Sequence, residues 1–224
     1  MPSLVVHHLE RSRSHRALWL LEELGVDYEI VTYRRHPKTS RAPDSLRAIH
    51  PLGRAPLVEL DGRVLAESGA ILETLSEELG DGALVPARGT EAFQRFRFFM
   101  HFAEGSMMAP LMVQLVASRV RSAPVPFFLK PVVKGIAAKI HGGYSGPETA
   151  RQLAFLDAEL ADRAWITGDD FSAADIQMSY PIEAALSRGE HGDVGHLRAY
   201  VERLRARPAY ARAVDKGGPV LLGG

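Results

Sequence analysis

The stretch VVHHLERSRSHRALWLLEELG, from Val5 to Gly25, decides how the chain begins to fold. Its first part is an apolar run typical of a strand, and its last part places apolar residues at helical spacing and ends at a glycine. A strand-to-helix turn therefore falls on residues 12–16. Helix N-termini usually carry acidic residues, because the macrodipole places partial positive charge there. Basic residues and hydroxyls at this turn instead indicate a site that receives an anion.

The composition limits the classes of protein to which the chain can belong. Its 224 residues suffice for one large domain or two small ones, and 27 Lys and Arg balance 27 Asp and Glu without a basic block, which argues against nucleic-acid binding. The absence of cysteine excludes disulfides, thiolate metal sites and a cysteine nucleophile. We expect no metal site, because the histidines lack ligand spacing. Without a signal-peptide pattern or a long apolar run, we expect a cytoplasmic protein with no stable membrane insertion.

The first part of the chain alternates between strand and helix patterns. Strands are predicted at residues 4–9, 28–33, 55–60 and 63–67, and helices at 14–24, 44–49 and 68–80. Asp61-Gly62, between the last two strands, is a strong hairpin signal. The order β-α-β-α-β-β-α combines a parallel crossover with an antiparallel hairpin, which is the layout of a thioredoxin-like domain. We therefore predict an α/β domain over residues 1–80.

Strand patterns disappear after this domain. Residues 81–90 contain glycine and proline breakers and are predicted to be a linker, and residues 91–224 are predicted to form an all-helical domain. Its helices are predicted at about 91–119, then after a proline-rich break up to 140, and at 147–163, 194–206 and 208–214. Another helix is predicted to follow Ser172, where Asp175 completes a capping-box pattern. We expect these two residues to be structural caps.

Four stretches carry a likeness to a known family. They are, in order, SRSHRALWLLEELG, HPLGRAPLVEL, LAESGAILETL and ITGDDFSAADI, and they span nearly the whole chain. Together they resemble the cytosolic glutathione transferases. The segments ERSRS and RRHPKTSRAP look most like the fungal and bacterial branch with an active-site serine. The resemblance implies a thioredoxin-like glutathione-binding domain, a helical domain with a co-substrate pocket, and transfer of alkyl or aryl groups to glutathione.

This resemblance assigns the catalytic hydroxyl to Ser12, with Ser14 as second choice because many relatives have proline there. A free thiol with a pKa near 8.5 is only a few per cent ionised at neutral pH. A hydrogen bond to its charged form is worth roughly 1.5–3 kcal/mol, which lowers the thiol pKa by about one to two units. The plainer alternatives are that either serine is a helix N-cap and that the arginines are solvated or paired with nearby glutamates. These arginines are Arg11, Arg13 and Arg16.

The resemblance also implies a set of glutathione contacts. Pro56 would follow a cis peptide bond that turns the Ala55 backbone toward the cysteinyl part of glutathione, and Arg54 would bind the glycine carboxylate. Ser68 and the start of its helix would hold the γ-glutamyl carboxylate. Glu67 would take the γ-glutamyl amine. The ordinary alternatives are a trans proline at a strand start, a plain N-cap and a surface carboxylate.

Two charged residues and a partner chain complete the expected site. Arg13 belongs to the basic cluster that suits an anion. Glu104 lies on the long helix after the linker, and the resemblance makes it a candidate to cross a dimer interface toward the γ-glutamyl amine; the alternative is a solvated helix face. We expect a two-fold homodimer, which is the commonest oligomer type.

The co-substrate is expected to be a small, partly apolar electrophile. Its candidate pocket residues, which core packing explains equally well, are Met107, Met108, Leu111, Met112, Leu115, Phe127 and Phe128. The basic and apolar segment 124–140 is expected to cover the site, extend the dimer or contact a membrane surface. The alternative functions are a glutathione-dependent peroxidase or isomerase on the same site, or a non-catalytic binding or assembly protein of the same fold.

Overall fold

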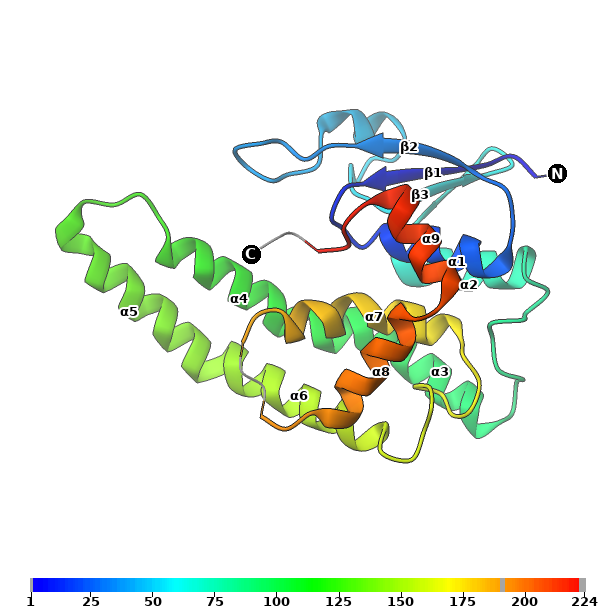
Figure 1. The fold of residues 1–224 in the computed structure, drawn as a ribbon. Coiled ribbons are helices and arrows are strands. Elements are labelled where there is room, and N and C mark those ends of the chain that lie inside the picture. The colour runs from blue at the N-terminus through cyan, green and yellow to red at the C-terminus, as the bar shows by residue number, and fades with distance from the viewer. Residues whose placement is uncertain (1, 190–191, 222–224) are drawn as a thin grey trace.

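A computed structural model describes residues 2–189 and 192–221 of the chain (Figure 1). The part before residue 80 contains a mixed four-stranded sheet with helices against it. In chain order its elements are β1 (Leu4–Leu9), α1 (His15–Leu24), β2 (Glu29–Tyr33), the 3-10 helix η1 (Asp44–Ala48), β3 (Leu57–Leu60), β4 (Arg63–Ala66) and α2 (Ser68–Glu78). This order confirms the predicted thioredoxin-like layout.

The sheet has the strand order β2–β1–β3–β4. In the centre, β1 pairs in parallel with β2 and antiparallel with β3, so that Val5 lies opposite both Glu29 and Glu59. Asp61 and Gly62 turn the β3–β4 hairpin with φ angles of 48° and 79°, in the left-handed region that this residue pair tolerates. The parallel crossover through α1 places the β1–α1 loop at the carboxyl end of a central strand.

The elements described after residue 90 are helices. They are α3 (Glu91–Phe102), α4 (Met108–Arg121), the 3-10 turn η3 (Phe127–Leu129), α5 (Lys130–Ile140), α6 (Gly146–Glu159), α7 (Ala173–Leu186), α8 (Gly195–Arg205) and α9 (Pro208–Gly217). Two π-helical turns, η2 (Ala103–Met107) and η4 (His141–Ser145), join α3 to α4 and α5 to α6. The single helix predicted from residue 91 is therefore continuous in the structure through η2.

The helix predicted over residues 147–163 has different ends. It continues from α5 through η4 and stops at Glu159, four residues before the predicted end. At that point the Leu160 amide is shared between the carbonyl oxygens of Leu156 and Asp157, which tightens the last turn. Sequence periodicity alone did not separate this turn from the helix.

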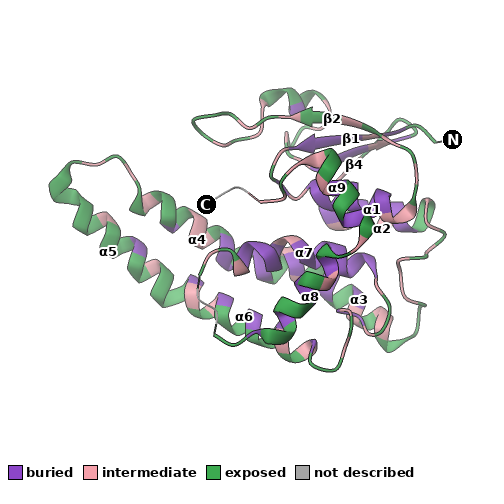
Figure 2. Cartoon of the chain, viewed as in Figure 1, coloured by how far each residue is buried: buried purple, intermediate pink, exposed green. Residues whose placement is uncertain are grey.

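Helix α1 is the element on which the two parts of the molecule meet. It packs against α2, α7 and α9 as well as against the sheet. Trp19 is fully buried there, and its ring meets that of Tyr210 on α9 edge-on at 4.9 Å between centroids. Figure 2 shows buried residues concentrated along β1, α1 and α7. The start of α1 is consequently held from several sides.

Helix α7 begins with the predicted capping box, which the structure confirms. The backbone N–H of Ser172 donates to Asp175 Oδ2 at 2.8 Å, and the Ser172 side chain accepts from the Asp175 backbone. Asp175 is fully buried, and its Oδ1 accepts from the Ile166 amide and the Tyr200 hydroxyl, both at 2.8 Å. One carboxylate therefore ties the start of α7 to α8 and to the preceding loop.

Helices α4 and α5 form a hairpin whose outer halves extend beyond the rest of the molecule (Figure 1). Met107 and Leu111 are buried at its base, whereas Phe127 and Phe128 are exposed at its tip. Core packing therefore accounts for the two buried side chains, and neither phenylalanine lines the pocket at Arg13, Pro56 and Ser68. Among the described residues, no helix has both the length and the apolarity needed to cross a membrane.

Candidate functional site

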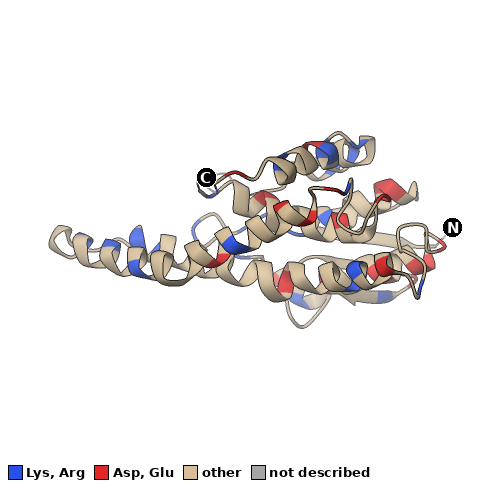
Figure 3. Ribbon diagram, turned by 90° about the horizontal axis from the view of Figure 1, so that it is seen from below, with Lys and Arg blue, Asp and Glu red and all other residues tan. Residues whose placement is uncertain are grey.

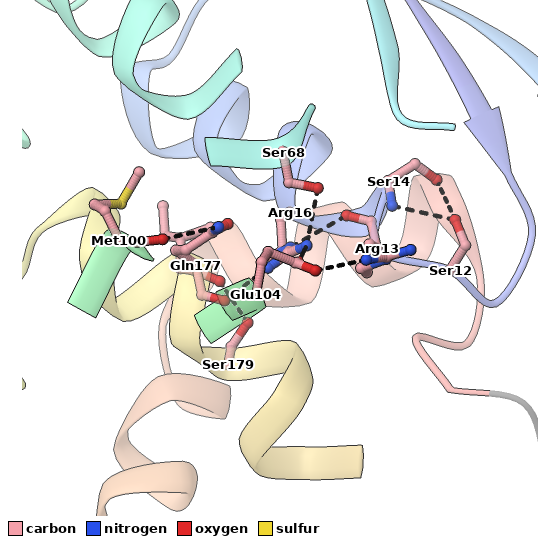
Figure 4. Close-up of polar contacts among 10 residues, drawn as sticks. Ser12, Arg13, Ser14, Arg16, Ser68, Met100, Glu104, Gln177 and Ser179 are labelled. Carbon is pink, nitrogen blue, oxygen red and sulfur yellow. Dashed lines mark hydrogen bonds and ion pairs between the residues drawn. The ribbon is translucent and has the colours of Figure 1, made fainter. Parts of the chain in front are cut away.

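The loop between β1 and α1 buries both candidate serines. Ser12 Oγ accepts the backbone N–H of Ser14 at 3.1 Å, and it lies 2.8 Å from Ser14 Oγ and 2.8 Å from the Leu9 carbonyl oxygen (Figure 4). Ser14 occupies the N-cap position of α1, but its side chain makes no capping hydrogen bond. Instead its Oγ accepts from the Leu9 amide at 3.1 Å. Plain helix capping therefore does not explain Ser14.

A histidine on the adjacent strand fixes the direction of these hydrogen bonds. His8 is buried, and its Nε2 lies 2.8 Å from the carbonyl oxygen of Gly217 at the end of α9. A carbonyl only accepts, so Nε2 carries the proton. Burial lowers the pKa of His8, so the ring is neutral near pH 7 and its Nδ1 is an acceptor. The Ser14 hydroxyl, 2.9 Å from Nδ1, is therefore the donor to His8.

This arrangement separates the roles of the two serines. The single hydroxyl proton of Ser14 is used on His8, and the Ser14 side chain is fully buried. The proton of Ser12 is directed at Leu9 or Ser14, and 5% of Ser12 remains exposed. Only Ser12 can turn its hydroxyl toward a ligand without leaving a buried ring nitrogen unpaired. The geometry favours Ser12 as the donor and Ser14 as its support.

Glu104 links two arginines at the start of α1 (Figure 4). Its Oε1 accepts from Arg16 Nη2 at 2.6 Å, and its Oε2 accepts from Arg13 Nη1. Arg16 also donates to Ser68 Oγ at 2.8 Å and to the Gln177 carbonyl oxygen at 2.8 Å. Four elements, α1, α2, η2 and α7, thus converge on one guanidinium group.

The electrostatics of this cluster keep Glu104 charged. Burial disfavours the charged carboxylate, but the neighbouring guanidinium groups of Arg16 and Arg13 outweigh that penalty and lower the pKa of Glu104. Arg16 is only 1% exposed, and burial lowers its pKa despite the opposing effect of Glu104. A buried guanidinium needs such a partner, because an unpaired buried charge is strongly unfavourable.

The burial of Arg16 corrects one interpretation of the sequence. As a solvated surface charge or a partner of Glu10, Glu22 or Glu23, Arg16 would lie on the outer side of α1; it lies inside and pairs with Glu104. A signal for this was present, because Arg16 stands four residues before Leu20 of the apolar stripe. Glu22 and Glu23 pair instead with residues of α9 and the segment before it, namely Arg207, Arg212 and Lys216.

A pocket of about 100 Å³ lies beside this cluster. It is lined by Arg13, His50, Leu52, Arg54, Ala55, Pro56, Leu57, Ala66, Glu67 and Ser68. The Ala55–Pro56 peptide bond is cis, as the resemblance implied. The pocket therefore brings together six predicted contact residues from three separate segments. Glu104 reaches the same place through Arg13, and Ser12 lies one residue before Arg13.

The start of α2 forms one wall of this pocket. Glu67, the N-cap residue, makes no side-chain capping bond, and the first turn of α2 contains no acidic residue. The first backbone N–H groups of a helix lack intrahelical acceptors and carry the positive end of the helix dipole. Glu67 also has a φ of 70°, which costs a non-glycine residue on the order of 1–3 kcal/mol and is typical of functional sites.

Several residues of this site gave no clear signal in the sequence. His8 appeared only as an interruption of an apolar strand, and its partner Gly217 lies 209 residues away. His50 and Leu52 line the pocket from the loop before the cis-proline. Gln177 enters through its backbone oxygen, which any residue type supplies. No group of three or more potential metal ligands occurs in residues 2–189 and 192–221.

Comparison with known proteins shows which family the chain resembles along its length. Residues 1–77 match the family model for the N-terminal domain of glutathione S-transferase, and residues 144–208 match the model for its C-terminal domain. The chain is 31% identical to glutathione S-transferase 1 of Saccharomyces cerevisiae, over 96% of each chain. It is 34% identical to glutathione S-transferase 3 of Schizosaccharomyces pombe, over 95% of this chain and 87% of that protein.

A solved structure shows the same likeness in three dimensions. The theta class glutathione S-transferase of Xanthomonas axonopodis pv. citri, solved with glutathione bound, superimposes with a TM-score of 0.73. The match covers 96% of this chain and 98% of that one, with 26% sequence identity. The similarity thus extends through both the sheet part and the helical part.

Proposed function

The chain belongs to the glutathione S-transferase family, and from this premise we propose that it conjugates glutathione to small electrophiles. The observation that carries the proposal is the pocket formed by the cis Ala55–Pro56 bond and the start of α2. Arg13 lines this pocket, and Ser12 is the residue before it. The tripeptide is anionic and carries the thiol that this cysteine-free chain lacks.

The pocket offers one group for each part of glutathione. In this proposal the backbone N–H and C=O of Ala55 pair with the cysteinyl residue as an added strand would. Arg54 binds the glycine carboxylate. The first N–H groups of α2, with Ser68, hold the γ-glutamyl carboxylate, and Glu67 accepts from the γ-glutamyl amine. Arg13, held by Glu104, adds positive charge beside these groups.

The chemistry follows from the hydroxyl of Ser12. Its proton turns from the Leu9 carbonyl to the glutathione sulfur and stabilises the thiolate, and the thiol proton leaves to solvent. A sulfur lone pair then attacks the electrophilic carbon. A carbon–sulfur bond forms, and the leaving group departs with its bonding electron pair. Ser14 and His8 hold Ser12 in place through the transfer.

The first test compares the two serines. We expect Ser12→Ala to raise the pKa of the bound thiol by about one to two units and to lower kcat with a chlorodinitrobenzene about ten- to a hundredfold. Calorimetry with reduced glutathione should still detect binding, because the backbone contacts remain. Ultraviolet absorbance of the thiolate measures the thiol pKa. Ser118→Ala, at an exposed serine of α4, is the matched control.

The outcomes separate the assignment from the function. An unchanged thiol pKa in Ser12→Ala would remove Ser12 from the mechanism, and the same titration on Ser14→Ala then tests the second choice. Binding of glutathione by the wild type without turnover of any aryl halide would contradict the transferase itself. Absence of binding would contradict the pocket.

We also propose a two-fold dimer of this chain. Within one chain the Glu104 carboxylate already holds Arg13 and Arg16. Its contact with the γ-glutamyl amine of a partner's glutathione stays a prediction. Analytical ultracentrifugation of the wild type tests the dimer. The contact of Glu104 with the γ-glutamyl amine is tested by the dissociation constant of glutathione for Glu104→Gln, measured on protein whose oligomeric mass has been determined.

A further inference from the structure

The tip of the α4–α5 hairpin exposes apolar side chains that no described part of the chain covers. Phe127 is 82% exposed and Phe128 is 64% exposed, and Val132 on the first turn of α5 is 55% exposed. All residues from Pro126 to Val132 are exposed, and η3 lies at the outer end of the hairpin (Figures 1 and 2). A run of large exposed apolar side chains in a folded protein marks an interaction site.

The same hairpin carries charge of a single sign. From Gly105 to Pro147 the sequence contains no Asp or Glu, although the whole chain has equal numbers of acidic and basic residues. The basic residues of this stretch are Arg119, Arg121, Lys130, Lys134 and Lys139. Figure 3 shows basic residues along the projecting hairpin, where no acidic residue appears. None of the five has a carboxylate within ion-pair distance in the described part of the chain.

Shape, apolarity and charge together select one kind of partner. The tip is the protruding end of a hairpin, so it suits a soft and flat surface. Aromatic side chains backed by lysines are typical of segments that enter the lipid headgroup region, where anionic lipids attract the basic residues. A second copy of the hairpin would bring the same positive charge and is therefore disfavoured. We propose that the α4–α5 tip binds peripherally to bilayers containing anionic phospholipids.

This binding leaves the glutathione pocket open. The pocket lies at the start of α2 and beside the sheet, whereas η3 is at the far end of the hairpin (Figure 1). The surface contact does not depend on catalysis, so it stands or falls separately from the proposed function. If both hold, the enzyme works where apolar electrophiles accumulate.

Co-sedimentation of the full chain with large vesicles tests the proposal. We expect binding at low salt to phosphatidylcholine vesicles containing about one third phosphatidylserine, weak binding to pure phosphatidylcholine, and release as sodium chloride rises. Phe127→Ser with Phe128→Ser should weaken binding at least tenfold. Replacing the three lysines should do the same, since each charge near the surface contributes about fivefold. That variant is Lys130→Gln, Lys134→Gln and Lys139→Gln.

Matched variants elsewhere serve as controls. Val31→Ser with Val64→Ser removes exposed apolar groups from the sheet, where they are 40% and 37% exposed. Replacing the exposed arginines Arg88, Arg151 and Arg198 by glutamine removes the same charge from other surfaces. Both controls should bind vesicles like the wild type. All variants should retain transferase activity toward a water-soluble aryl halide, which shows that they are folded.

Three results would overturn the proposal. The first is that the wild type does not sediment with anionic vesicles at low salt. The second is that the tip variants bind these vesicles as tightly as the wild type. In the third case light scattering would show that the Phe127→Ser, Phe128→Ser protein has a smaller oligomeric mass than the wild type. The tip would then be a contact between copies of the chain.

Discussion

At the scale of single residues, the site depends on buried polar groups that support the groups facing the ligand. Ser14 and His8 hold Ser12, and Glu104 and Arg16 hold Arg13 and Ser68. Ser14, His8 and Arg16 are more deeply buried than Ser12 and Ser68. Glu104 bridges Arg13 and Arg16. Small changes in these supports should therefore alter the site without touching the ligand.

Glu104→Gln tests this support at Arg16. The neutral amide leaves a buried guanidinium without its countercharge, and we expect the free energy of unfolding to fall by about 2–3 kcal/mol at neutral pH. Chemical denaturation measures the change. Glu78→Gln, which breaks an exposed pair with Arg63, is the control and should have a much smaller effect.

The same pair predicts a pH dependence. The folded protein has a lowered pKa at Glu104, below the ordinary value of 4.5, so this group's stabilisation is complete above about pH 4.5. It is lost as the pH falls through the lower folded-state pKa. The stability difference between the wild type and Glu104→Gln should shrink over that acidic range. A difference that stays constant down to strongly acidic pH would show that the charge of Glu104 is not what stabilises Arg16.

At the scale of elements, the starts of α2 and α7 differ in how their first backbone N–H groups are satisfied. The start of α2 has a strained N-cap residue and no side-chain capping bond, and its residues Glu67 and Ser68 line a pocket. The start of α7 has a complete capping box and a buried carboxylate. A helix start with all its donors satisfied is structural, and one with free donors beside a pocket is available to an anion.

Two substitutions at α7 separate capping from the wider network. Ser172→Ala should lower the free energy of unfolding by about 1 kcal/mol, as expected for one cap. Asp175→Ala should lower it by about 3 kcal/mol or more, because it leaves the Ile166 amide and the Tyr200 hydroxyl unpaired in the interior. Thermal unfolding measures both. Thr90→Ala, at the exposed cap of α3, should resemble Ser172→Ala, and an equal effect at Asp175 would refute its linking role.

At the scale of the molecule, local patterns predicted the elements, and long-range contacts explain what they missed. Strand and helix periodicity, the Asp-Gly turn and the capping box all act within a few residues, and they gave the thioredoxin-like order and the helical second part. Burial of Arg16 and the His8–Gly217 contact depend on segments far apart in sequence. Helical spacing places Arg16 on the apolar side of its helix, but no local pattern identifies the distant partners of Arg16 or His8. The site residues came chiefly from the family resemblance.

The contact between α9 and the serine loop supplies the last prediction, because it joins the two ends of the chain. A Cβ on Gly217 would lie 2.5 Å from Leu18 Cδ1 and 3.2 Å from His8 Cε1, so Gly217→Ala must displace the buried Leu18 side chain, and the His8 ring or α9 must give way slightly as well. We expect the free energy of unfolding to fall by about 1–3 kcal/mol. Since His8 orients Ser14 and Ser14 orients Ser12, the bound thiol pKa should also rise and kcat should fall, although no pocket residue has changed.

Gly135→Ala on α5 is the matched control for this substitution. A Cβ there meets no atom within 4 Å, so alanine should be neutral or stabilise the helix by up to about 1 kcal/mol, with catalysis unchanged. Denaturation and thiol titration on the same preparations distinguish the outcomes. If Gly217→Ala lowers stability but leaves the thiol pKa at its wild-type value, the C-terminal helix only packs against the serine loop. A rise in the thiol pKa would instead show that the position of α9 reaches the reacting sulfur through His8 and the two serines.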